Sequence, residues 1–224
     1  MADTRRNQRY GNDDGMVHIS GHPLVQHKLT LLRNKRTFPK DFRELIGEVG
    51  TFLFYEATGD LPLEQVEVQT PLVETTGQML AGKSPVIVPI LRAGLGLYES
   101  ILKLVPQADV GFIGMYRNEQ SLEAVEYYRK FPKDCAERRV FLVDPMLATG
   151  NSACDAIANL VRAGCAQEQI IFICLVAAPE GVTQIREKFP RVRIVAAALD
   201  DGLNDHGYIV PGLGDAGDRI FGTK

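Results

Sequence analysis

From Gly82 onward the chain alternates short, continuous apolar runs with amphipathic stretches. Five runs bounded by turn residues predict buried β-strands at residues 86–91, 110–115, 140–143, 170–177 and 192–197. Helical spacing of apolar residues predicts helices at residues 95–105, 152–163 and 182–189, the second of them closed by Gly164 as a C-cap. Continuous apolar strands that alternate with helices are typical of a parallel sheet covered on both faces. The pattern therefore predicts an α/β fold with a parallel sheet flanked by helices.

The first part of the chain has a different texture. Residues 1–15 are polar and rich in Arg, Asn, Asp and Gly, so we expect a disordered N-terminal arm without a catalytic role. Apolar residues recur at three- and four-residue steps over residues 39–58, which predicts an amphipathic helix packed on the core. Residues 71–83 fit either a connector or a hairpin. With 224 residues, 45% of them hydrophobic, we expect a single domain over residues 16–224.

The net charge and the lengths of the apolar segments limit the kinds of partner that the protein can have. The formal net charge of -3 gives no global electrostatic reason for nucleic acid or an anionic membrane to be the main partner. Any bound phosphate must then be held locally. The chain begins without the apolar segment of a signal peptide, and no later run approaches the 18 or more residues of a membrane span. We therefore expect a soluble, cytoplasmic protein.

Cysteine and histidine show no metal-binding spacing. The four cysteines form no C-x-x-C pair and have no nearby histidine at zinc-ligand spacing, and the four histidines show no such spacing either. We expect reduced, buried thiols at Cys135, Cys154, Cys165 and Cys174.

The loop after residue 143 is the most informative segment. Gly150 and Ala148 are small enough to let backbone N–H groups approach an anion, and the next helix presents its positive end. Thr149 and Ser152 add hydroxyl donors, while the upstream carboxylate of Asp144 could accept hydrogen bonds from sugar hydroxyls. Together these groups describe a cradle for ribose 5-phosphate. An ordinary strand-turn-helix with a Thr or Ser N-cap remains the alternative.

Two further loops follow predicted strands and carry arginine. Residues 92–96 lack the third glycine of a dinucleotide fingerprint, because Glu99 stands there, so Arg92 is either an anion ligand or a surface residue beside a tight turn. Arg117 follows the strand at 110–115 and opens a charged, glycine-free segment that reaches Phe131. That segment fits a lid, an oligomer arm or a solvated connection.

Five glycines crowd the C-terminal segment 202–218, which argues against a helix and for tightly folded backbone. If this backbone surrounds a planar base, main-chain N–H and C=O groups can read the edge of that base. A flexible tail is the alternative, but Tyr208, Ile209 and Leu213 offer apolar anchors for an ordered segment.

These segments resemble a known family. The segment from Asp144 to Ser152 is similar to the signature of type I phosphoribosyltransferases. Five blocks occur in the order found in uracil phosphoribosyltransferases, namely residues 89–96, 114–119, 144–152, 177–181 and 207–224. The resemblance runs from about residue 17 to residue 224 and implies the type I phosphoribosyltransferase fold, with a smaller hood or arm region. Pro145 replaces the second acidic residue of the wider superfamily, as in the uracil branch. Asn151 stands where the family often has a second glycine.

The resemblance also implies an activity. Uracil and 5-phospho-α-D-ribose 1-diphosphate (PRPP) would give UMP and diphosphate, with Mg2+ bridging oxygens of the donor. Arg92 and Arg117 would neutralise the diphosphate, and Asp144 would hold the ribose hydroxyls. The 5-phosphate would be held by Ala148, Thr149, Gly150, Asn151 and Ser152. Pro145, Met146 and Leu147 would also bind the donor.

Uracil would be read by the backbone at Ile209, Gly214 and Ala216, with Asp215 on the sugar and magnesium side. No general base stands out, and Asp205, His206 and Asp215 are only candidates. A homo-oligomer, dimer or tetramer, is expected from the resemblance, and GTP is a candidate effector.

Three other functions compete with this interpretation. A phosphoribosyltransferase for another base would share the Thr149-Gly150 turn. A nucleotide-sensing regulator that binds RNA would keep the fold, but the acidic composition weighs against it. A Rossmann oxidoreductase is disfavoured by the missing third glycine.

Overall fold

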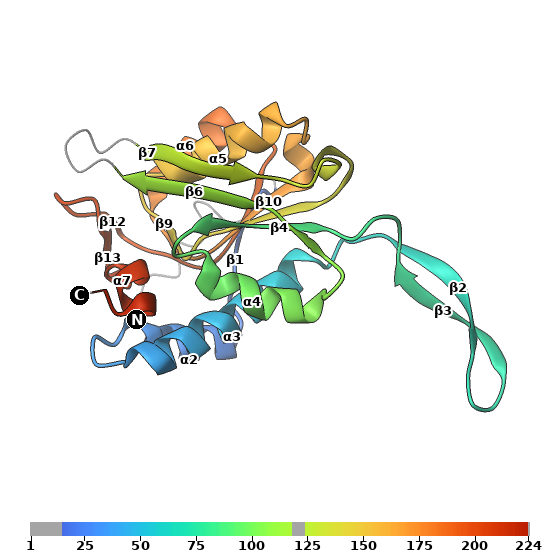
Figure 1. Cartoon of the computed structure of the whole chain (residues 1–224). Helices are drawn as coiled ribbons and strands as arrows, with labels where there is room; N and C mark the ends of the chain where they lie inside the picture. The colour runs from blue at the N-terminus through green and yellow to red at the C-terminus, as the bar shows by residue number, and fades with distance from the viewer. Residues whose placement is uncertain (1–14, 118–123, 224) are drawn as a thin grey trace.

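The structure is a computed structural model that describes residues 15–117 and 124–223. A nine-stranded sheet forms its centre (Figure 1), with β1-β11-β10-β8-β4-β6-β7 as the strand order. Its strands are β1 (Val17–Ile19), β4 (Val86–Leu91), β5 (Asp109–Val110), β6 (Phe112–Arg117), β7 (Ala124–Lys130), β8 (Val140–Val143), β9 (Met146–Leu147), β10 (Ile170–Ala177) and β11 (Arg193–Leu199). All the pairings are parallel except the one between β6 and β7.

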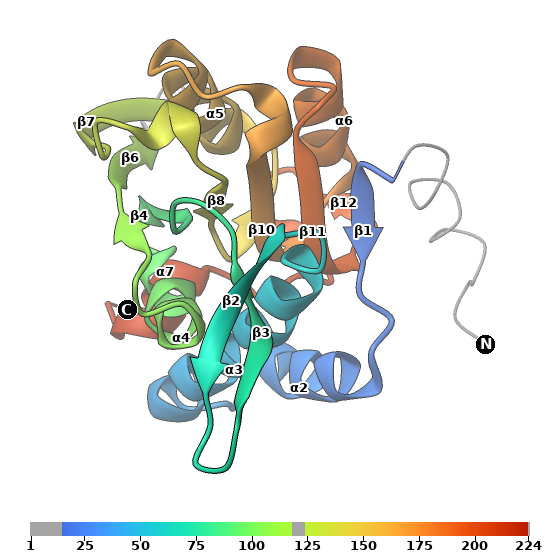
Figure 2. The same cartoon turned by 90° about the vertical axis from the view of Figure 1, so that its right-hand side faces the viewer.

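Helices cover both faces of this sheet, as Figures 1 and 2 show. They are α2 (Pro23–Arg33), α3 (Pro39–Ala57), α4 (Leu95–Leu104), α5 (Asn151–Arg162), α6 (Pro179–Lys188) and α7 (Ala216–Phe221). Successive strand residues point to opposite faces, so each strand serves two cores. Val88 of β4 packs in the cluster shared with α5 and α6, whereas its neighbour Ile87 packs with α2, α3 and α4. The predicted parallel sheet with helices on both faces is confirmed.

Most of the predicted elements are confirmed with small shifts. The strand expected at 110–115 is divided at Gly111 into β5 and β6, and the Gly111 N–H bonds to the carbonyl of Ile87 in β4. Helix α6 begins at Pro179, three residues before the predicted start, since proline suits the first helical position. Gly164 follows α5 with φ of 97°, the left-handed conformation expected of a residue that ends a helix. All four cysteines are free and buried, as predicted.

Residues 71–83 belong to a long antiparallel hairpin, so the hairpin alternative holds. It consists of β2 (Leu63–Gln69) and β3 (Glu74–Leu80), paired along their whole length. The hairpin projects away from the sheet and its helices (Figures 1 and 2), and nearly all of its residues are exposed.

The C-terminal segment is ordered but not free of helix. A short ladder joins β12 (Gly202–Leu203) to β13 (Ile209–Val210), and the chain then enters α7 at Ala216. The prediction against a helix is therefore wrong for residues 216–218. The reason is local, because the Asp215 side chain accepts a hydrogen bond from the Asp218 N–H at 2.9 Å and caps the helix.

Two predictions involve the ends of the chain. The expected disordered arm at residues 1–15 lies outside the described residues except for Gly15. Among the helices of the described ranges, none is both long and apolar enough to cross a membrane.

Candidate active site

The loops that were predicted to carry chemistry meet at one edge of the sheet. Strands β4, β8, β10 and β11 are parallel, so their carboxyl ends lie on the same side. Gly94, at the start of α4, packs directly under this edge. A Cβ atom there would lie 2.6 Å from the carbonyl oxygen of Val143 and 2.7 Å from backbone atoms of Ile90. The Arg92 loop and the Asp144 loop therefore begin in contact with each other.

The segment after β8 forms a tight turn into a helix. Gly150 has φ of 88° and precedes α5, and a Cβ there would lie 2.6 Å from Oε1 of Gln184 and 3.1 Å from the carbonyl oxygen of Gly181. Only glycine suits both the conformation and the space. Asn151 is the first residue of α5, so the positive φ falls on Gly150. Asparagine at position 151 thus costs no backbone strain.

A glutamine from α6 supports this turn. Gln184 donates from Nε2 to Oδ1 of Asn151 at 2.9 Å. The Gln184 Oε1 atom is buried and has no hydrogen-bond partner among the described residues. Buried acceptors of this kind are uncommon and costly. Sequence reasoning missed Gln184, since no local motif marks a residue 33 positions from its partner.

Asp144 lies at the end of β8 in an apolar setting. Burial raises the pKa of its carboxyl to about 8, against the opposing effect of a backbone hydrogen bond from Met146. At neutral pH the free protein therefore holds Asp144 mainly in its uncharged form. A neutral carboxyl does not repel an approaching phosphate, and it can ionise once hydroxyl donors or a cation reach it.

The two arginines of the prediction lie on neighbouring strands. Arg92 follows β4 and is exposed, with its guanidinium carbon 5.8 Å from the ring centre of Phe221 in α7. Arg117 is the last residue of β6, which pairs with β4. Of the charged segment that follows it as far as Phe131, residues 118–123 lie outside the described residues, and residues 124–130 form β7, which pairs antiparallel with β6. Because β4 and β6 are parallel, the backbone positions of both arginines lie at the same edge of the sheet.

The residues expected to read a base lie in the turn before α7. Ile209 and Ala216 are buried, while Gly214 is exposed with φ of 71°. Asp215 is also exposed and serves as the N-cap of α7. The candidate bases Asp205 and His206 lie at the exposed tip between β12 and β13.

This turn contacts the loop after β4. A Cβ atom at Gly217 would lie 4.0 Å from the Cβ of Ala93, and one at Gly96 would lie 3.0 Å from the side chain of Ile220. The predicted donor-binding and base-binding segments thus share one edge of the sheet. Two further residues hold the turn and were not predicted, namely Arg33 and Asp200.

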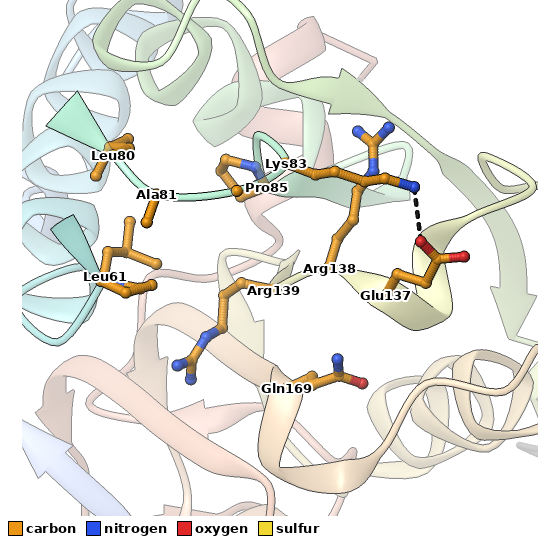
Figure 3. Close-up of a pocket in the computed structure, with 11 residues that line it drawn as sticks. Leu61, Leu80, Ala81, Lys83, Pro85, Glu137, Arg138, Arg139 and Gln169 are labelled. Atoms are coloured by element: carbon orange, nitrogen blue, oxygen red, sulfur yellow. Dashed lines mark hydrogen bonds and ion pairs between the residues drawn. The ribbon is translucent and has the colours of Figure 1, made fainter. Parts of the chain in front are cut away.

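A cavity of about 280 Å3 lies elsewhere, at the root of the hairpin (Figure 3). Its lining includes Pro85 and Arg139, which precede β4 and β8, so it opens at the amino ends of these strands. Lys83 in its wall is bound to Asp134 at 2.9 Å and Glu137 at 2.7 Å. The cavity is therefore separate from the edge where the predicted residues gather.

The sequence of the chain is similar to those of known proteins. The family model described as uracil phosphoribosyltransferase matches residues 19–223. A protein named uracil phosphoribosyltransferase from Streptococcus equi subsp. zooepidemicus (strain MGCS10565) is 58% identical over 210 residues, which are 94% of this chain and 100% of that protein. The protein of the same name from Streptococcus pyogenes serotype M5 (strain Manfredo) gives the same identity and coverage.

Solved structures agree in fold. The AQ2163 protein from Aquifex aeolicus superposes with a TM-score of 0.88 at 40% identity, over 93% of this chain and 99% of that chain. Adenine phosphoribosyltransferase from Leishmania donovani gives a TM-score of 0.51 at 12% identity, over 85% of this chain and 86% of that chain, a likeness of fold alone. The fold is the mixed α/β fold of type I phosphoribosyltransferases, and the chain belongs to the uracil phosphoribosyltransferase family.

Proposed function

We propose that the chain transfers the 5-phosphoribosyl group of PRPP to uracil and releases diphosphate, giving UMP for pyrimidine salvage. Membership of the family supports this reaction. The observation that carries it in the structure is the turn at Gly150, whose left-handed backbone opens α5 at the carboxyl edge of the sheet. A helix N-terminus preceded by small residues is a natural site for a phosphate group.

The donor is held by three parts of the edge in this proposal. Backbone N–H groups and hydroxyls of residues 148–152 bind the 5-phosphate, and Asp144 accepts hydrogen bonds from the ribose hydroxyls. Arg92 and Arg117 neutralise the diphosphate, for which a guanidinium is well suited because it can make two parallel bonds to an anion. Charge that builds up on the departing diphosphate is thereby stabilised.

Uracil is read by main-chain groups of Ile209, Gly214 and Ala216. The base offers an acceptor, a donor and an acceptor along one edge, whereas cytosine reverses two of these. A fixed backbone pattern then leaves buried groups unpaired with cytosine, at about 1–3 kcal/mol for each group. The closed turn before α7 and the buried Ile209 and Ala216 support this role.

Magnesium is proposed to accompany the donor. The exposed Asp215 carboxylate is a candidate protein ligand, since carboxylate oxygens suit this ion. When bound, the ion would neutralise diphosphate charge. The donor-binding residues bind and orient the sugar, and Asp215 lies in the base-binding turn, where it caps α7.

Three further proposals concern location, assembly and regulation. The protein works in the cytoplasm, as its sequence led us to expect. The family resemblance supports a homo-oligomer and GTP as an effector. Exposed apolar side chains on the projecting hairpin, including Leu72 and Val73, support self-association.

The function is tested with the purified full chain, PRPP, Mg2+ and one base at a time. We expect UMP from uracil and no nucleotide from cytosine, hypoxanthine or adenine, measured by chromatography. Product from another base instead of uracil would favour a different phosphoribosyltransferase. Absence of any product from folded protein, together with salt-dependent binding of RNA, would favour the regulator.

A further inference from the structure

We propose that Arg33 and Asp200 are positioning residues for the base, because they hold the turn that presents uracil-reading backbone. The inference rests on the proposed function of residues 209–216. Arg33 is the last residue of α2, and Asp200 directly follows β11, so neither belongs to the turn or to a recognised motif.

The two side chains form a close ion pair. Arg33 donates from Nη1 to Oδ2 of Asp200 at 2.8 Å and from Nη2 to Oδ1 at 2.6 Å. The Asp200 side chain is only 3% exposed and that of Arg33 is 25% exposed. Two parallel charge-assisted bonds fix the relative orientation of both groups. A buried carboxylate without this partner would be costly, so the pair forms as a unit.

Both members of the pair also hold the peptide groups of Gly212. Its N–H donates to Oδ2 of Asp200 at 2.9 Å, and its carbonyl accepts from Nη1 of Arg33 at 2.9 Å. Gly212 has φ of 59°, and a Cβ there would lie 2.1 Å from the carbonyl oxygen of Ile209. The Arg33–Asp200 pair, called the clamp below, thus fixes Gly212, which lies between Ile209 and Gly214.

A second arginine, Arg219, binds the residue of the turn that follows Gly212. Arg219 donates to the carbonyl of Leu213 at 2.9 Å and to the carbonyls of Leu32 and Asn34 at 2.7 and 2.8 Å. Its guanidinium lies 4.0 Å from the ring centre of Phe42. Arg33 and Asp200 therefore hold Gly212, and Arg219 holds the next residue, Leu213, and links it to the end of α2.

Main-chain recognition depends on this attachment more than side-chain recognition would. A peptide group has no rotamers with which to recover a lost contact, so a small shift of the turn misplaces several donors and acceptors together. The phosphate loop lies on α5 and has its own supports at Gly181 and Gln184. Loosening the clamp should therefore weaken uracil binding much more than donor binding.

The test compares Asp200→Asn and Arg33→Lys with wild type in steady-state kinetics. Asp200→Asn keeps the shape and loses the charge, and Arg33→Lys keeps the charge and loses one of two parallel bonds. We expect the KM for uracil to rise about tenfold in Asp200→Asn, with a smaller rise in Arg33→Lys and a much smaller change in the donor KM of both variants. Arg33→Lys carries the comparison if Asp200→Asn does not fold.

The chain offers a matched control at the other end of β11. Arg193 binds Asp60 through two nitrogens, at 2.9 and 3.2 Å, and donates to the carbonyl of Ala57 at 2.8 Å. Asp60→Asn should lower thermal stability without a selective change in the KM for uracil. Equal changes in both KM values, or none, in the clamp variants would overturn the inference. An inactive wild type would instead count against the proposed function.

Discussion

Asp144 has a carboxyl with a raised pKa, and it is also proposed to contact the ribose of the donor. Its pKa of about 8 in the folded protein lies above the usual value of 3.8, because burial disfavours the charge. Between these two pH values the folded state binds a proton at Asp144 that the unfolded state has released. The free energy of unfolding therefore falls as the pH rises from about 4 to about 8 through this group.

Replacing Asp144 by Asn should remove this pH dependence. We expect the stability of Asp144→Asn relative to wild type to grow between pH 4 and pH 8, by at most about 1.4 kcal/mol per pH unit, and to level off above that. Urea unfolding at several pH values measures the difference. The same variant should raise the donor KM, because an amide accepts hydroxyl donors less well than a carboxylate. Parallel stability curves would contradict the raised pKa.

At the same scale, the chain-local groups could be predicted and their distant partners could not. Asp144 and Gly150 belong to one short segment whose residue types and spacing already describe a phosphate turn. Asp200 and Gln184 act through partners 167 and 33 positions away, so only the folded chain brings them together. Their roles leave no pattern in a single sequence.

At the scale of elements, the long buried strands and most of the helices followed directly from the apolar pattern. Helix α2, with 11 residues, was not predicted. Strand β10 has the predicted bounds, because eight successive buried residues leave little choice. Short or exposed elements were not predicted from this pattern. Strand β1 has three residues, both strands of the hairpin are exposed, and α7 begins only because Asp215 caps it. These elements depend on pairing or capping more than on periodicity.

Gly94 is a point of close approach between two loops, and its replacement is predicted to be costly. In Gly94→Ala the new methyl group would meet backbone atoms of Val143 and Ile90 that cannot rotate away. We expect a loss of about 1–3 kcal/mol in unfolding free energy and a larger proportional loss of UMP formation, because both donor loops move. Thermal melting and the product assay measure these effects.

Gly21→Ala is the control for this substitution. A Cβ atom at Gly21 would meet nothing within 4 Å, and no left-handed backbone is present there. Its stability and activity should match those of wild type. Equal behaviour of the two variants would show that the contact under Gly94 can relax.

At the scale of the whole molecule, the parallel sheet separates two regions. The carboxyl edge gathers the proposed donor and base segments, and the amino edge carries the root of the hairpin and its cavity. The place of the first region was predicted, since loops that follow parallel strands meet at one edge, and the roles of its residues stay predictions. The sequence does not decide between a connector and a hairpin for residues 71–83, because these residues contact little of the core that sets the apolar pattern.

The hairpin tip is where self-association can be tested. Leu72 is 94% exposed and Val73 is 61% exposed, although burial of such side chains is favourable. We expect wild type to sediment as a dimer or larger assembly, and Leu72→Ser with Val73→Ser to shift it toward smaller species. Phe38→Ser is the control, since Phe38 is 74% exposed but precedes α3 on the body of the protein. A monomeric wild type, or equal shifts in both variants, would place the proposed interface elsewhere or remove it.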